Sequence, residues 1–219
     1  MSAKNTERML FETGVVAIMR AKSSDQLLAA AEAIMKGGVN VIEVTMTTPN
    51  ALKVIQEATD RFSDDVLFGA GTVLDPETAR AAILAGAQFI VTPTLNKKTI
   101  KICRRYAVPI IPGAYTPTEI LTAWEAGASS VKVFPASAGG PGYIKAIKAP
   151  LPQISLTAVG GVNVENTAEF FSVGVDVVGV GGELVNQILL DRGDLKEITR
   201  RAEQFQAEAK KGKIQSGRR

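Results

Sequence analysis

The segment GGVNVIEVTM, residues 37–46, places two glycines directly before a run rich in Val and Ile. The same pattern recurs in AGAQFIV (85–91), AGASSVKV (126–133) and VGVDVVGV (173–180). In each copy a glycine precedes the apolar run by a few residues: Gly38, Gly86, Gly127 and Gly174. A glycine there can end a helix in a left-handed turn and let a strand begin. The pattern predicts a repeated unit in which a helix is followed by a strand.

Eight strand-like runs occur along the chain, most of them nearly continuous in apolarity. They are VVAIMR (15–20), VNVIEVTM (39–46), VLFGAGTV (66–73), FIVTPT (89–94), PIIPGA (109–114), SVKVFP (130–135), SLTAVGG (155–161) and VVGVGG (177–182). Continuous apolar strands that alternate with amphipathic helical stretches predict a parallel sheet buried on both faces. The first residues of successive strands are spaced by about 20 to 27 positions, which favours a (β/α)8 TIM barrel. A doubly wound open sheet is disfavoured, because no glycine-rich phosphate loop follows the first strand.

We expect one barrel domain over residues 1–209. The segment before Val15 is predicted to form an extra N-terminal helix over the barrel bottom, and residues 194–210 the last, charged helix. Helix starts are expected at four polar residues: Asp75, Asn96, Thr116 and Asn163. The basic stretch KKGKIQSGRR (210–219) is expected to be a disordered extension.

The composition excludes several kinds of chemistry and partner. The 219 residues include no His and one Cys, which removes His-assisted nucleophiles, His zinc sites and imidazole acid–base catalysis. The formal charge is +3, but residues 210–219 carry five cations and no acid, so the rest is slightly acidic. With few aromatic residues and no basic helix, we expect no nucleic-acid partner.

The sequence predicts no membrane partner and a cytoplasmic location. No uncharged apolar window of about 18 residues exists, and the first ten residues are polar. The single Cys103 cannot form an intramolecular disulfide, so nothing requires an oxidising compartment.

Two charged residues interrupt otherwise apolar strands. Glu43 lies late in the second predicted strand and Lys132 late in the sixth. Active sites of such barrels lie at the carboxyl ends of the strands, and alternate strands supply the same interior layer. Both side chains can therefore point into one central volume. A lysine there loses its water, which lowers its pKa and supplies free amine for attack on a carbonyl. The alternatives are an outward-pointing Lys132 or a structural ion pair.

Other strand ends suggest the walls of a binding site. In GAGTV (69–73) the glycines permit either close ligand approach or close packing, and Thr72 adds a hydroxyl. Glycine pairs end the seventh and eighth strands, in VGGV (159–162) and VGVGGE (178–183). Barrels commonly bind phosphate there, and helices are expected to begin near Asn163 and Glu183. Arg20, which ends the first strand, can add positive charge to the cavity.

Six strings together resemble the 2-keto-3-deoxy-6-phosphogluconate (KDPG) and 4-hydroxy-2-oxoglutarate (KHG) aldolase family. They are IEVTMTTP (42–49), FGAGTVLDPE (68–77), FIVTPTLN (89–96), IPGAYTPTE (111–119), VKVFPAS (131–137) and VGGV (159–162), within a resemblance over residues 10 to 205. The resemblance implies a class I aldolase on a (β/α)8 barrel, a homotrimer, and no metal or cofactor.

The resemblance also implies roles for individual residues. Lys132 is the expected Schiff-base lysine and Glu43 the general acid–base. Thr72 is expected at the substrate carboxylate, with Pro93 and Phe134 beside the pyruvyl group. Gly160, Gly161, Gly181 and Gly182 fall where members of the family bind phosphate.

Three positions depart from the family pattern. Thr47 stands where some members carry Arg, Val159 where many have Thr, and Gly182 where many have Ser. Two hydroxyls that contact phosphate are therefore missing, and backbone donors are left to bind it.

The expected activity is reversible cleavage of a 2-keto-3-deoxy-4-hydroxy acid to pyruvate and an aldehyde. KDPG, which yields glyceraldehyde 3-phosphate, is the first candidate substrate. KHG or another unphosphorylated 2-keto acid is the alternative. Two other hypotheses stay open: an isomerase or epimerase in which Glu43 and Lys132 act without covalency, and a non-catalytic barrel used as an assembly module.

Overall fold

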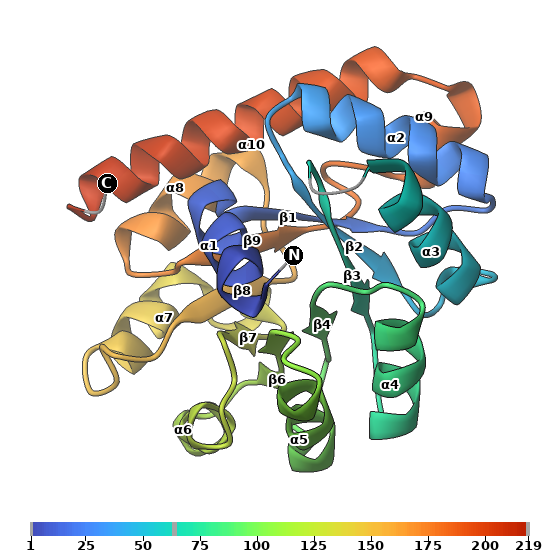
Figure 1. The fold of residues 1–219 in the computed structure, drawn as a ribbon. Helices are drawn as coiled ribbons and strands as arrows, with labels where there is room; N and C mark the ends of the chain where they lie inside the picture. Colours follow the sequence, from blue (N-terminus) through green and yellow to red (C-terminus); the bar gives the residue numbers. More distant parts are fainter. Residues whose placement is uncertain (1, 63–64, 218–219) are drawn as a thin grey trace.

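Parallel strands form a closed cylinder at the centre of the molecule, and helices surround it (Figure 1). The structure is a computed structural model that describes residues 2–62 and 65–217. The strands are β1 Val15–Met19, β2 Val41–Thr45, β3 Leu67–Gly71, β4 Ile90–Val91, β5 Ile110–Ile111, β6 Gly113–Ala114, β7 Val131–Val133, β8 Leu156–Val159 and β9 Val177–Val180. They pair in the order β5-β4-β3-β2-β1-β9-β8-β7-β6, and every pairing is parallel.

The strands β5 and β6 are the two halves of the fifth predicted strand, so nine short strands make an eight-stranded barrel. Pro112 separates them, and proline has no backbone N–H to donate to a ladder. Its carbonyl still accepts from the backbone N–H of Lys132 at 2.9 Å, while β5 pairs with β4 and β6 with β7. The segment 109–114 thus closes the ring, and the predicted (β/α)8 barrel is confirmed.

The helices alternate with the strands, as the sequence predicted. They are α1 Ala3–Thr13, α2 Ser24–Lys36, α3 Ala51–Phe62, α4 Pro76–Leu84, α5 Lys97–Arg105, α6 Pro117–Glu125, the 3-10 helix η1 Ala136–Ala138, α7 Gly140–Lys148, α8 Val164–Ser172, α9 Gln187–Arg192 and α10 Leu195–Gln215. The four expected N-caps, Asp75, Asn96, Thr116 and Asn163, all accept hydrogen bonds from the first turns of their helices. None of these helices, within the described ranges, is long and apolar enough to cross a bilayer.

The N-terminal helix α1 closes the barrel at the amino ends of the strands, also as predicted. Its fully buried Leu10 packs into an interior cluster supplied by alternate strand positions. That cluster consists of Leu10, Val16, Val41, Leu67, Phe89, Val91, Ile111 and Val177. The apolar plug leaves the opposite, carboxyl end of the barrel available for polar groups.

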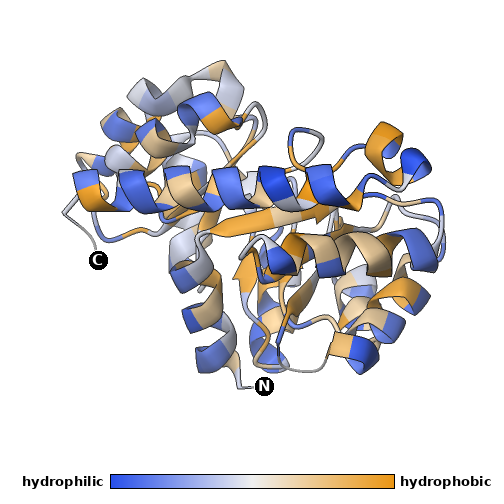
Figure 2. Ribbon diagram, turned by 90° about the horizontal axis from the view of Figure 1, so that it is seen from above, coloured by the Kyte–Doolittle hydropathy of each residue, from blue (hydrophilic) through white to orange (hydrophobic). Residues whose placement is uncertain are grey.

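The helices cover the barrel with their apolar faces. Figure 2 shows the strands in hydrophobic colours and the surrounding helices with mixed hydrophobic and hydrophilic stripes. The side of each strand that faces outward packs against these helices, as Val131 and Val133 do on either side of the inward-pointing Lys132. Burial on both faces explains why the strands read as continuous apolar runs.

The C-terminal stretch corrects one prediction. Residues 210–215 are not a disordered tail, because they continue α10, which runs along α8 and α2 (Figure 1). Its buried face follows a helical spacing of four and three residues: Ile198, Ala202, Phe205, Ala209 and Gly212. Lys213 then donates to the carbonyls of Phe11 and Glu12, at 3.0 Å each, at the end of α1. The many basic residues of this stretch made its helical spacing of apolar residues hard to recognise. Residues 218–219 of the predicted tail lie outside the described residues.

Candidate active site

A cavity of about 530 Å³ opens at the carboxyl ends of the strands. It is lined by all ten residues that the sequence singled out: Arg20, Glu43, Thr72, Pro93, Lys132, Phe134, Gly160, Gly161, Gly181 and Gly182. These residues come from seven different strand ends, so only barrel closure brings them together. The position agrees with that of active sites in other barrels of this class.

Glu43 and Lys132 both point into the barrel rather than out among the helices. Glu43 lies beside Ile18 and Gly69 on the neighbouring strands, and Lys132 beside Gly113 and Thr157. Glu43 is 3% exposed and Lys132 5%. The structure therefore contradicts the alternative in which Lys132 reaches solvent between helices.

The two buried groups are coupled electrostatically without touching. Burial lowers the pKa of Lys132, an effect that the charge of Glu43 opposes and that of Arg20 supports. Burial raises the pKa of Glu43, against the opposing charges of Lys132 and Arg20. Among the ion pairs of residues 2–62 and 65–217, none joins Lys132 to Glu43. Both shifts favour a neutral amine and a neutral carboxyl group, and both side chains line the same cavity.

The glycines of GAGTV make room for the interior side chains. A Cβ at Gly71 would lie 1.8 Å from the Oε1 atom of Glu43, and a Cβ at Gly69 would lie 2.5 Å from the ring of Phe89. The carboxylate of Glu43 thus occupies the space that a side chain at position 71 would fill. The nearest side chains to these glycines thus belong to the barrel interior, Phe89 at Gly69 and Glu43 at Gly71, rather than to a helix.

The wall around Lys132 combines an aromatic ring with polar groups. The Nζ atom lies 4.9 Å from the centre of the Phe134 ring, which is itself 39% exposed at the cavity mouth. Thr72 adopts a left-handed backbone conformation with φ at 58°, which turns the chain sharply after β3. Arg20 is exposed at the end of β1, so its charge can reach a ligand from the rim.

The carbonyl groups of the glycine pair after β8 are both bound by neighbouring segments. Gly160 and Gly161 have positive φ angles of 92° and 74°, which favour glycine. The backbone N–H of Ser137 donates to the carbonyl of Gly160 at 3.0 Å, and the side-chain amide of Asn166 to that of Gly161 at 2.9 Å. In the described chain nothing accepts from the N–H of Gly161, which remains available to an anion.

The second glycine pair lies in a turn rather than at a helix start. We expected a helix to begin near Glu183, but α9 begins at Gln187, after the N-cap Asn186. The backbone N–H groups of Leu184 and Val185 donate to the carbonyl of Gly181 and close the turn. The donors here are therefore backbone groups of a turn without a helix dipole behind them. Asn166 and Asn186, which tether the two glycine segments, were not predicted as site residues.

The chain matches a known protein family over most of its length. The sequence profile described as KDPG and KHG aldolase matches residues 6–201. The chain belongs to the KDPG and KHG aldolase family. A relative in Escherichia coli (strain K12), 2-dehydro-3-deoxy-6-phosphogalactonate aldolase, is 41% identical over 171 residues, which are 78% of this chain and 83% of the relative. Aldolases of this kind are carbon–carbon lyases, so the family is one of enzymes.

Two solved structures share the barrel. KDPG aldolase from Legionella pneumophila, with pyruvate captured at low pH as a covalent carbinolamine intermediate, has a TM-score of 0.84 and 30% identity. The match covers 90% of this chain and 96% of that one. A cube-shaped protein cage designed by fusing symmetric oligomeric domains has a TM-score of 0.87 and 35% identity, over 94% of this chain and 75% of that one.

The space beside Gly71 leads to a testable prediction about aldolase activity. Gly71→Ala should lower kcat by about 100-fold, because a shift of the Glu43 carboxylate by the order of 1 Å misplaces a reacting group. Gly142→Ala is the matched control, since its Cβ would meet no atom within 4 Å. Steady-state kinetics, with thermal melts to verify folding, measure the effect. Equal kcat values for both folded variants would contradict the role of Gly71.

Proposed function

We propose that this protein is a class I aldolase that cleaves a 2-keto-3-deoxy-4-hydroxy acid to pyruvate and an aldehyde through a Schiff base on Lys132. The observation that carries the proposal is the desolvated Lys132 amine, which shares a closed-barrel cavity with the Glu43 carboxyl group. The carbinolamine in the Legionella pneumophila relative supports covalent chemistry on pyruvate in this family.

The first half of the reaction needs a neutral amine and a proton donor. The lone pair of Lys132 attacks the keto carbon and forms a carbinolamine. Glu43, whose pKa burial raises, donates its proton to the departing hydroxyl group. Water leaves, and the nitrogen becomes a positively charged iminium. The lowered pKa of Lys132 supports the attacking form of the amine.

The second half uses the carboxylate that the first half produces. Glu43 accepts the proton of the 4-hydroxyl group, directly or through water, while the bond between the third and fourth carbons breaks. The electron pair of that bond moves to the iminium nitrogen and leaves an enamine, and the aldehyde departs. Protonation of the enamine carbon and hydrolysis of the resulting iminium release pyruvate and restore Lys132. Arg20 and Thr72 are positioned at the cavity wall to bind the substrate carboxylate.

We propose a phosphorylated substrate, with KDPG as the first candidate. Backbone N–H groups at Gly161, Gly182 and Glu183 replace the hydroxyl groups that Val159 and Gly182 lack. The identity of 41% to an aldolase named for the galactonate epimer supports that epimer as a second candidate. The unphosphorylated KHG remains the alternative substrate.

We also propose that the protein is a homotrimer in the cytoplasm. Large apolar side chains remain exposed on the barrel surface, among them Leu84 at 62% and Trp124 at 41%. The number of three subunits comes from the family resemblance, and these exposed side chains are available to a subunit interface. Light scattering should give about three times the chain mass of 23.2 kDa, and a monomer mass would contradict the trimer.

Trapping with pyruvate tests the covalent mechanism. Incubation with pyruvate and sodium borohydride should reduce the iminium and attach a three-carbon adduct to the peptide that contains Lys132, as detected by mass spectrometry. Lys132→Met should abolish the adduct and aldol cleavage, whereas Lys145→Met, on the exposed face of α7, should retain both. A wild-type enzyme without the adduct would favour the isomerase hypothesis. Absence of all aldol activity would favour the assembly module.

Parallel turnover assays test the substrate class. We expect a higher kcat/KM for KDPG or its galactonate epimer than for KHG, because only the former two carry a phosphate that can bind the glycine turns. A preference for KHG would remove the phosphate site from the proposal and leave the Schiff base intact.

A further inference from the structure

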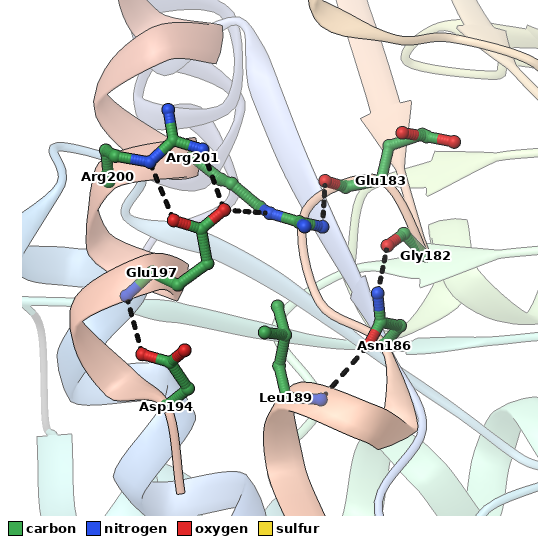
Figure 3. A network of polar contacts seen from close by, with 8 residues as sticks. All are labelled: Gly182, Glu183, Asn186, Leu189, Asp194, Glu197, Arg200 and Arg201. Carbon is green, nitrogen blue, oxygen red and sulfur yellow. Dashed lines mark hydrogen bonds and ion pairs between the residues drawn. The ribbon is translucent and has the colours of Figure 1, made fainter. Parts of the chain in front are cut away.

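The turn formed by Gly181 to Leu184 is held from outside the cavity by hydrogen bonds to its carbonyl groups. The side-chain amide of Asn186 donates to the carbonyl of Gly182 at 3.3 Å, and the Nη1 atom of Arg201 to that of Glu183 at 3.0 Å (Figure 3). Asn186 also caps α9, where it accepts from the N–H of Leu189 at 3.1 Å. Arg201 lies on α10, so the last helix reaches the turn directly.

The tether at Gly182 orients a free donor of the turn, and the tether at Glu183 fixes the peptide next to it. In a trans peptide the carbonyl group and the following N–H point in opposite directions. The carbonyl of Gly182 is bound on the Asn186 side, so the N–H of Glu183 points away from that side. The carbonyl of Glu183 is bound by Arg201, and the N–H of the same peptide, at Leu184, donates to Gly181 at 2.9 Å. Across the described residues, the N–H groups of Gly182 and Glu183 have no acceptor.

Arg201 is itself fixed by a charged neighbour. Its Nε atom donates to the Oε1 atom of Glu197 at 2.8 Å, and the side chain of Arg201 is only 26% exposed. Arg200 holds the same carboxylate with two bonds of 2.7 Å, but it is 54% exposed and makes no bond to the turn. The two arginines therefore share an anchor, and only Arg201 also binds the turn, at the carbonyl of Glu183.

From this network we infer that Arg201 is a positioning residue for the anion-binding turn, so that α10 sets the affinity of the enzyme for the phosphorylated end of its substrate. The inference rests on the proposed function, in which this turn binds the phosphate of the substrate. Gly182 and Glu183 have space for an anion, because no atom lies within 4 Å of a Cβ at Gly182 and both residues line the cavity.

A split between substrates tests the inference. Arg201→Ala should raise KM for the phosphorylated 2-keto-3-deoxy acid by about tenfold, the effect of one hydrogen bond from a charged donor. The KM for the unphosphorylated KHG should change much less, and kcat should stay within about twofold. The inhibition constant for inorganic phosphate should rise together with the first KM. Arg200→Ala is the matched control and should leave the ratio of the two KM values at its wild-type value.

Three results would overturn the inference. They are an equal rise in both KM values after Arg201→Ala, the same change after Arg200→Ala, and a wild-type enzyme that inorganic phosphate does not inhibit. If Arg201→Ala does not fold, Arg201→Lys replaces it. This variant keeps the positive charge and one donor nitrogen, so we expect a smaller rise in KM for the phosphorylated substrate. Trapping of pyruvate on Lys132 in each variant distinguishes the two proposals. If the adduct still forms while the two KM values change equally, the inference about Arg201 is wrong and the Schiff-base mechanism stands.

Discussion

The candidate active site depends on the burial of an amine and a carboxyl group inside a largely apolar barrel. Charged groups without water are costly, and the cost falls when they become neutral. Burial lowers the pKa of Lys132 and raises that of Glu43, and the two groups do not meet in an ion pair that would restore their charges. In the proposed mechanism, the desolvation that opposes folding at this site supplies the nucleophile and the proton donor.

The rest of the barrel keeps this arrangement in place. Leu10 and Phe89 fill the amino end of the cylinder with apolar atoms, so the cavity is confined to the carboxyl end. Gly71 leaves the volume that the Glu43 carboxylate occupies. The glycine turns on the other side of the mouth have their carbonyl groups bound by Ser137, Asn166, Asn186 and Arg201, and their free N–H groups provide positive polarity without another buried charge. In the proposed mechanism, side chains inside the barrel therefore react, and backbone groups of the glycine turns bind the anion.

Most of the fold could be predicted from the sequence because the barrel has a strong periodic signal. All eight predicted strands form, and Gly38, Gly86, Gly127 and Gly174 adopt positive φ angles between 87° and 106°. Lys132 and Glu43 could be found because each interrupts an apolar strand. The predictions that were wrong, the disordered tail and the helix near Glu183, concerned segments in which charge or glycine concealed the apolar spacing.

Other features depend on contacts between distant segments and could not be predicted. The space at Gly71 is used by Glu43 only because β2 and β3 pair in one register. The bond from Arg201 to the carbonyl of Glu183 depends on how α10 docks, and a helix sequence does not encode that docking in isolation. The family resemblance points to the glycines of the anion site but not to the side chains that orient them.

The most direct measurement of the central claim is the titration of Lys132 itself. NMR of protein labelled with 13C at the lysine ε carbon would give its pKa in the wild type, in Glu43→Gln and in Arg20→Met. We expect a wild-type pKa below the usual 10.5, a lower one without the negative charge of Glu43, and a higher one without the positive charge of Arg20. A wild-type Lys132 that titrates at 10.5 or above would contradict a desolvated amine and the mechanism built on it.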